Sequence, residues 1–298
     1  MKPWTRRTFG HPLEAGLLQI LFRLLRALPL DAASGLGGWI ARTLGPLLPV
    51  SKWARRNLAL AFPDRTQAAR ELILRDCWEN LGRTFAEYPH LPRLLDERVT
   101  VEGLEHLGNL RDENGPALFF SAHLGNWELL PMMASRVGLP LAGIYRAANN
   151  PLVDRLLRRL RGKDAAVLFP KGGPGARAAL AHLRDGGRLA LLVDQKMNDG
   201  VSVPFFGKPA MTAPALAQLA LRYHCPVFPA RIERLHGARF RLIVEPQLLM
   251  PDSGDRHADV LATMTDVNAI LERWIRAKPE DWLWLHRRWP AETHQGRA

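Results

Sequence analysis

The chain has 298 residues, of which 47% are hydrophobic and 23% are charged. This balance is typical of a globular protein with a sizeable core, and it excludes a disordered tail, a collagen-like repeat and a multi-span membrane protein. The two cysteines, Cys77 and Cys225, are too few for a disulfide framework or a thiolate metal site. The formal net charge of +12 indicates an anionic partner, such as nucleic acid, anionic lipid or a phosphorylated substrate.

Residues 1–55 carry two apolar runs with basic flanks. The first run, 16–30, is interrupted by Arg23 and Arg26, so it falls short of the ~20 apolar residues that cross a bilayer. The second run, 36–50, is broken by glycine and proline. We therefore expect helices that lie on an anionic membrane surface, and the alternative is core helices with snorkelling arginines. The basic residues around the runs are Lys2, Arg6, Arg7, Arg42, Lys52, Arg55 and Arg56.

Residues 56–298 are predicted to form one continuous α/β domain. A helical pattern over 58–95 is followed by short apolar runs that alternate with helical segments, which favours a mostly parallel central sheet flanked by helices. The carboxyl-terminal part predicts a helix, an antiparallel hairpin, a long helix and an aromatic tail. The expected strands are 116–122, 141–146, 166–170, 189–194, 227–235 and 240–244; the expected helices are 127–137, 151–161, 176–183, 213–223 and 256–277; the tail is 281–289.

The string SAHLGNWE at 121–128 lies where a buried strand is expected to end and a helix to begin, which is where α/β sheets bind ligands. If Gly125 supplies a turn, Glu128 can reach back and hold one ring nitrogen of His123. The other nitrogen would then be free to act as a general base. The alternative is a structural strand-end histidine beside an acid that favours a helix N-terminus. The order of residues does not match a zinc motif.

Several motifs in this order resemble one known family. HLGNWE is similar to the HxxxxE/D block of the lysophospholipid acyltransferase superfamily. Together with the strings that follow it, the pattern resembles the late lauroyl and myristoyl acyltransferases of lipid A biosynthesis, from about residue 10 to residue 290. The strings are YR at 145–146, NP at 150–151, LVDQ at 192–195, VPFFG at 203–207, MTAP at 211–214 and WLHRRW at 284–289.

The resemblance implies transfer of a fatty acyl chain from an acyl carrier protein thioester, or acyl-CoA, to a hydroxyl of a membrane glycolipid. It implies His123 as general base and Glu128 as its partner, with direct transfer and no cofactor or metal. The expected location is the cytoplasmic face of the inner membrane of a Gram-negative bacterium, without a nucleic-acid partner. A lysophospholipid or aminolipid acceptor is the nearest alternative.

Five further residues are expected to bind substrate. Arg146 follows the second strand and suits an anionic group, because a guanidinium binds phosphate or carboxylate in a bidentate manner. Asp194 and Gln195 end another strand at the same edge and are expected to position the substrate. Lys171 stands where the broader superfamily has an acid, so it is expected to contact an anion. The fifth residue is Asn126 of the HLGNWE string.

Cationic side chains also gather on the expected helix 151–161. This helix could attract an acidic carrier protein or lipid phosphates, although a solvated basic face is the ordinary explanation. The residues concerned are Arg155, Arg158, Arg159, Arg161 and Lys163.

Two other classes of protein share features with this sequence. Gly173, Gly175 and Ala178 match a relaxed GxGxxA after a strand, and Asp194 ends the next strand, as in a dinucleotide-binding unit. That unit would sit third in the sheet instead of first, and Pro174 occupies its turn. The other class is a basic protein that binds membranes or nucleic acid and has no enzymatic activity. Against this class, the basic residues of this chain are scattered over many elements instead of forming one strip.

Overall fold

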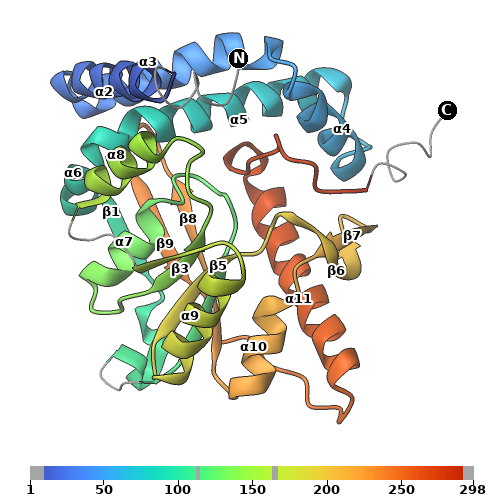
Figure 1. Ribbon diagram of the computed structural model, residues 1–298. Coiled ribbons are helices and arrows are strands. Elements are labelled where there is room, and N and C mark those ends of the chain that lie inside the picture. The colour runs from blue at the N-terminus through green and yellow to red at the C-terminus, as the bar shows by residue number, and fades with distance from the viewer. Residues whose placement is uncertain (1–9, 112–114, 163–166, 291–298) are drawn as a thin grey trace.

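The computed structural model of the protein describes residues 10–111, 115–162 and 167–290. Within these ranges, seven strands form one sheet in the order β1-β9-β8-β2-β5-β3-β4, and β6 and β7 form a separate two-stranded ribbon (Figure 1). The strands are β1 (Val99–Glu102), β2 (Ala117–Ser121), β3 (Ala142–Tyr145), β4 (Val167–Pro170), β5 (Arg188–Leu192), β6 (Lys196–Phe205), β7 (Lys208–Thr212), β8 (Val227–Arg234) and β9 (Phe240–Val244).

Helices flank the sheet, so the predicted α/β fold with a mostly parallel central sheet is confirmed. In the described ranges, no helix has the length and apolar character needed to span a membrane. The α-helices are α2 (His11–Ala27), α3 (Leu30–Leu44), α4 (Ser51–Ala61), α5 (Gln67–Glu87), α6 (Leu91–Glu97), α7 (Leu129–Arg136), α8 (Pro151–Arg161), α9 (Gly173–Arg184), α10 (Ala215–Tyr223) and α11 (Arg256–Ala277).

The strands β8, β2, β5, β3 and β4 run parallel to one another, and β8 pairs antiparallel with β9 as predicted for the hairpin. Two features were not predicted. The short strand β1 pairs in parallel with β9, and β6 pairs antiparallel with β7. The sequence pattern predicts neither strand. Strand β1 has only four residues, and β6 begins with exposed residues that lack an apolar alternation.

Strand β2 divides its side chains between two hydrophobic clusters. Leu118 and Phe120 pack with α9, α10 and α11 on one face of the sheet, whereas Ala117 and Phe119 pack with α6 and α7 on the other. All four side chains are buried. This alternation follows from the two-residue period of a strand, and it explains why a strand covered on both faces appears as a continuous apolar run.

The aromatic tail lies in the core. Trp282, Trp284 and Trp289 are buried and contact Phe205 or Phe206 from the β6–β7 ribbon. Arg288 is buried as well; its guanidinium donates to Met211 O at 3.0 Å and to Thr212 Oγ1 at 2.7 Å. Burial lowers the pKa of Arg288 to about 10. The tail therefore joins the ribbon to the main body of the protein.

Helices α3 and α5 approach each other through glycine. A Cβ atom built at Gly37 would lie 2.6 Å from the carbonyl oxygen of Gly82, and one built at Gly82 would lie 2.2 Å from the carbonyl oxygen of Gly37. Side chains larger than hydrogen would therefore separate the two backbones. In Figure 1, α2 and α3 lie along α5 at one end of the molecule. This close contact holds the amino-terminal helices on the α/β body.

We expect Gly37→Ala to reduce the free energy of unfolding by about 1–3 kcal/mol, because the added methyl group overpacks the α3–α5 contact. Gly35→Ala on the same helix is the matched control. A Cβ at Gly35 meets nothing within 4 Å, so that variant should be neutral or more stable by up to ~1 kcal/mol. Urea denaturation of the three proteins measures this difference. Equal stability of the two variants would contradict the proposed packing constraint.

Candidate active site

Four of the predicted residues follow parallel strands that are neighbours in the sheet. His123 lies just beyond β2, Asp194 beyond β5, Arg146 beyond β3 and Lys171 beyond β4. Because parallel strands have their carboxyl ends at the same edge, the four residues lie along one edge of the sheet. Strands β2 and β5 pair directly, and this pairing brings His123 and Asp194 into contact.

Asp194 holds His123 through both its side chain and its backbone. The ring Nδ1 of His123 lies 2.9 Å from Asp194 Oδ1, and the backbone N–H of His123 donates to Oδ2 at 3.1 Å. The indole N–H of Trp282 also donates to Oδ2, at 2.8 Å. Asp194 is completely buried. An ionised carboxylate can only accept hydrogen bonds, so the proton lies on Nδ1 and Nε2 is left as the acceptor of a neutral ring.

The charges of this pair stabilise each other. Burial alone would lower the pKa of His123, but the negative charge of Asp194 and its hydrogen bond raise that pKa above the ordinary value. Burial would raise the pKa of Asp194, yet the charge of His123 and the donors around the carboxylate hold that pKa well below its usual range. The site is therefore built to favour a protonated ring, which is the state that a general base reaches after it accepts a proton.

The second ring nitrogen of His123, Nε2, is not held by a carboxylate, and the side chain is not completely buried. The side chain is 17% exposed, and the nearest polar partner of Nε2 is the amide Nε2 of Gln195 at 3.5 Å. The ring of Trp127 contacts the imidazole edge-on, with 5.2 Å between the centroids. Gln195 is exposed. A hydroxyl that approaches Nε2 would thus meet one acceptor nitrogen and one neighbouring amide.

Glu128 lies elsewhere than we expected. It does not hydrogen-bond to His123; its two oxygens accept from the guanidinium of Arg161, at 2.8 and 3.1 Å. Arg161 also donates to the hydroxyl of Tyr88 at 3.0 Å. The reason is local: α7 begins at Leu129, and Glu128 stands at its N-cap position with the carboxylate bonded to Arg161 of α8 instead of the helix end. Asp194 already occupies Nδ1 of His123. Glu128 acts on His123 only through its charge, which contributes less to the raised pKa than Asp194 does.

The loop that carries His123 is held by the carboxyl-terminal segment. Leu124 forms a β-bridge with Trp282, and Leu283 N–H donates to the carbonyl oxygen of His123 at 3.1 Å. Gly125 N–H donates to Asp281 O at 3.0 Å. Gly125 has φ +53°, and a Cβ there would lie 2.9 Å from Ile232 O, so glycine is required at this turn.

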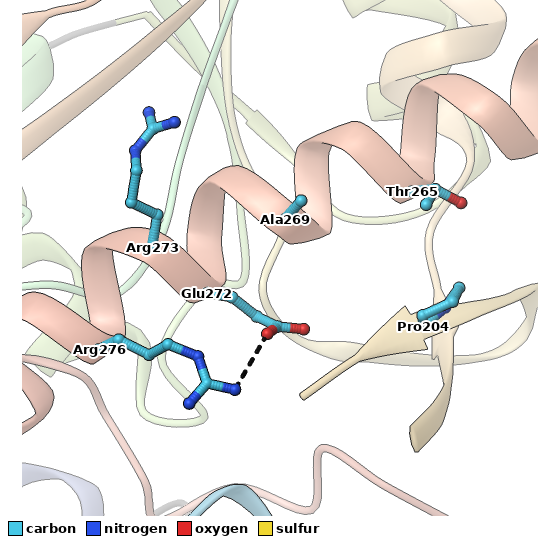
Figure 2. Close-up of a pocket in the computed structure, with 6 residues that line it drawn as sticks. All are labelled: Pro204, Thr265, Ala269, Glu272, Arg273 and Arg276. Atoms are coloured by element: carbon cyan, nitrogen blue, oxygen red, sulfur yellow. Dashed lines mark hydrogen bonds and ion pairs between the residues drawn. The ribbon is translucent and has the colours of Figure 1, made fainter. Parts of the chain in front are cut away.

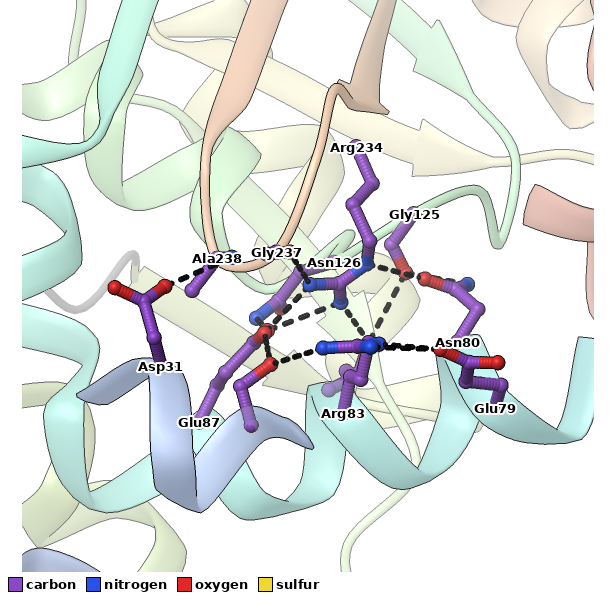
Figure 3. Close-up of polar contacts among 12 residues, drawn as sticks. Asp31, Glu79, Asn80, Arg83, Glu87, Gly125, Asn126, Arg234, Gly237 and Ala238 are labelled. Carbon is purple, nitrogen blue, oxygen red and sulfur yellow. Dashed lines mark hydrogen bonds and ion pairs between the residues drawn. The ribbon is translucent and has the colours of Figure 1, made fainter. Parts of the chain in front are cut away.

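A buried polar network supports the same loop from behind (Figure 3). Asn80 and Thr84 of α5 donate to the carbonyl oxygen of Gly125, each at 3.2 Å. Asn126, expected to bind substrate, is fully buried and donates to Glu87 at 2.9 Å. Glu87 also pairs with both terminal nitrogens of Arg234 from β8, at 2.5 and 3.0 Å. Asn126 therefore contacts this network, and the network joins α5, β8 and the loop.

The remaining predicted residues lie on the surface. Arg146 and Lys171 are exposed, and the structure gives neither a side-chain contact with His123; Lys171 N–H donates to Tyr145 O at 2.9 Å. On α8, Arg155, Arg158 and Arg159 are exposed, whereas Arg161 is held by Glu128. Four predicted cationic residues lie outside the described residues: Lys2, Arg6, Arg7 and Lys163.

The structure bears on three other kinds of site: a surface hollow, a metal site and a dinucleotide-binding loop. A surface hollow of about 290 Å³ lies between β6 and α11, and none of the predicted residues lines it (Figure 2). In the described ranges, no group of three or more His, Cys, Asp or Glu side chains is arranged to hold a metal ion. The glycine pattern of the dinucleotide alternative has a packing explanation: a Cβ at Gly175 would lie 1.7 Å from Pro170 O. The acid of that alternative, Asp194, is buried against His123.

Trp282 is a site residue that the sequence did not reveal. Its indole hydrogen bond completes the shell around Asp194, but it comes from a segment 88 positions away. The only available signal was the aromatic character of the tail, which by itself predicts core packing.

We expect Asp194→Asn to lower the pKa of His123. The amide keeps the shape of the side chain but removes the charge, so burial then acts without compensation. Titration of the His123 ring by heteronuclear NMR measures the change. Glu128→Gln is the control and should lower the same pKa by less, since Glu128 contributes less to it. A pKa that is unchanged in Asp194→Asn would show that the pair does not set the protonation of His123.

Comparison with known proteins identifies the family of this chain. A family model described as bacterial lipid A biosynthesis acyltransferase matches residues 5–291. A lipid A biosynthesis acyltransferase of Haemophilus influenzae is 29% identical over 283 residues, which cover 90% of this chain and 87% of that protein. The lipid A biosynthesis lauroyltransferase of Escherichia coli is 28% identical, covering 80% and 78%, and its myristoyltransferase is 24% identical, covering 77% and 72%. The chain belongs to the bacterial lipid A biosynthesis acyltransferases, and it is an acyltransferase.

Proposed function

We propose that this acyltransferase moves a fatty acyl chain from an acyl carrier thioester to a hydroxyl of a lipid A precursor. The observation that carries the proposal is the ring of His123, which is held through Nδ1 by a buried carboxylate while Nε2 has the amide of the exposed Gln195 beside it. Relatives named as lauroyl and myristoyl transferases of lipid A supply the class of acceptor and of acyl group.

In the proposed reaction, Nε2 of His123 accepts the proton of the acceptor hydroxyl as its oxygen attacks the thioester carbonyl. The new C–O bond gives a tetrahedral intermediate, and this intermediate collapses with cleavage of the C–S bond. The departing thiolate then takes the proton back from Nε2. Asp194 stabilises the imidazolium in between, because its negative charge lies 2.9 Å from Nδ1.

Direct transfer without an acyl-enzyme intermediate is supported by the state of the thiols. Cys77 and Cys225 are both buried. Burial raises the pKa of Cys77 to about 12 and that of Cys225 to about 11, so neither supplies a thiolate at neutral pH.

We assign Glu128 a different part in this mechanism from the one the sequence suggested. It keeps Arg161 beside the site, where the guanidinium is partly buried and also bonded to Tyr88. The roles of Arg146 and Lys171 as contacts for anionic groups of the substrate remain predictions; both are exposed at the edge of the sheet that carries His123.

The test is an acyl-transfer assay with a tetra-acylated lipid A precursor and a radiolabelled acyl carrier thioester. We expect His123→Ala and Asp194→Asn each to lose a factor of about 10² or more in kcat/KM, because general-base catalysis contributes roughly 10²–10⁴-fold. His257→Ala, an exposed histidine at the start of α11, is the control and should retain wild-type activity.

Two results would overturn parts of this assignment. Full activity of His123→Ala would remove the proposed base. Activity only with lysophospholipid or aminolipid acceptors would keep the mechanism and reject the lipid A precursor as the substrate.

We further propose that the amino-terminal helices bind the cytoplasmic face of the inner membrane. Helix α2 exposes an apolar stripe at helical spacing, which includes Leu13, Leu17 and Leu24. Helix α3 exposes a second stripe, which includes Trp39 and Leu44, while its small residues pack on α5. Soluble proteins rarely leave such a continuous apolar surface uncovered, and the interfacial region of a bilayer would cover it.

Replacement of Leu17, Leu24 and Trp39 by serine should weaken sedimentation with phospholipid vesicles by about 10²-fold or more, since burial of each side chain contributes roughly 1.5–3 kcal/mol. Leu72→Ser with Leu249→Ser removes exposed apolar side chains from other parts of the protein and is the control. If both sets of substitutions weaken binding equally, the amino-terminal stripes are not the membrane-binding surface.

A further inference from the structure

Three cationic side chains lie near one tryptophan on α4. Trp53 of α4 is half-buried, and the guanidinium of Arg287 lies 4.0 Å from its ring centroid. Arg56 lies at 5.0 Å and Lys52 at 5.4 Å from the same ring. Two of the cations come from α4, and the third comes from the carboxyl-terminal segment. Residues far apart in sequence thus build one cluster, the Trp53 cluster (Lys52, Trp53, Arg56 and Arg287).

No ion pair among the described residues neutralises the positive charge of this cluster. Lys52, Arg56 and Arg287 are all exposed. The adjacent Arg55 differs, because it pairs with Glu71 at 2.6 Å. Three like charges around one ring repel one another, and the indole face offsets only part of that repulsion. An anion placed between them would relieve it.

The position of the cluster indicates which anion it meets. Leu47, Leu48 and Val50 immediately precede α4 and are exposed, Leu47 by 80%. They follow α3 directly in the chain, and the helices α2, α3 and α4 lie at the same end of the molecule (Figure 1). Apolar side chains that enter the hydrocarbon boundary would place neighbouring cations and an indole at the level of the lipid phosphates.

We propose that the Trp53 cluster binds the phosphates of anionic phospholipids at the bilayer surface. This inference rests on the proposed membrane binding of the amino-terminal helices and names the lipid head groups that this surface prefers. We infer an anionic partner because the three cations form no ion pair among the described residues. We infer a lipid because exposed apolar residues adjoin the cluster.

The cluster also connects the membrane surface to the active site. Asn57 of α4 donates to Trp284 O at 2.9 Å and to His286 O at 2.7 Å. The same segment carries Arg287 and holds the His123 loop through Leu283. Binding of head groups at Arg287 would therefore fix the orientation of the active site relative to the bilayer.

The experiment compares vesicles of neutral phosphatidylcholine with vesicles that also contain phosphatidylglycerol. We expect wild type to bind both and to bind the anionic vesicles more tightly. The Lys52→Gln, Arg56→Gln, Arg287→Gln triple variant should lose about 10²-fold of affinity for anionic vesicles, or roughly fivefold per cation. Its binding to neutral vesicles, which depends on α2 and α3, should stay within about twofold of wild type.

A variant of equal charge controls for the net basicity of the protein. Arg177→Gln, Arg184→Gln and Arg222→Gln remove three exposed cations from α9 and α10 and should lose less than about threefold. The single variant Arg287→Gln, on an exposed side chain, gives a second test and should lose roughly fivefold.

Each other outcome decides against the inference. An equal loss in the two triple variants would assign the effect to net charge, and no loss in the Trp53 variant would remove the site. Failure of the wild type to bind either kind of vesicle would reject the proposed membrane binding itself. Normal binding to neutral vesicles without a preference for the anionic ones would reject only the Trp53 cluster.

Discussion

The buried carboxylate of Asp194 is the constraint on which the site depends. A charged group without exposure to water is stable only when other groups compensate its charge and satisfy its lone pairs. Here the imidazole and backbone N–H of His123 and the indole of Trp282 do so. These donors come from the end of β2 and from the carboxyl-terminal segment, whereas Asp194 ends β5. The hydrogen bonds of Asp194 therefore require that β2 lies beside β5 and that the carboxyl-terminal segment reaches the same edge of the sheet.

A second buried charge lies behind the first. Glu87 and Arg234 are both buried, and an ion pair in such a place adds little net stability because desolvation opposes the attraction. The ion pair nevertheless fixes the positions of its neighbours through hydrogen bonds. Arg234 donates to Asn80 and Thr84, and Glu87 accepts from Asn126. These contacts support the His123 loop from the protein side. Because Asp194 occupies Nδ1, Nε2 is the ring nitrogen of His123 that is left for a substrate.

The surface of the protein has two regions of different character. The amino-terminal helices expose apolar stripes, and the glycine contact between α3 and α5 attaches them closely to the body that holds His123. The sheet edge beyond β3 and β4 instead exposes the cations Arg146 and Lys171. Under the proposed function, the apolar stripes would meet the bilayer, and the two cations would meet the phosphorylated head group of the acceptor.

The sequence alone determined the order and type of most elements, the parallel sheet, the β8–β9 hairpin and the position of HLGNWE at the end of a strand. These features depend on local periodicity and on turn residues, which are visible within a short window. The tertiary structure decided which carboxylate holds His123. Adjacency of β2 and β5 is set by crossover connections that no local pattern contains, so Asp194 could be placed at the sheet edge but not on Nδ1. Nearness in sequence favours Glu128 as the partner of the ring, yet at the start of α7 its carboxylate binds Arg161. The β6–β7 ribbon and the contact of Trp282 likewise depend on packing between distant segments, which only the folded chain brings together.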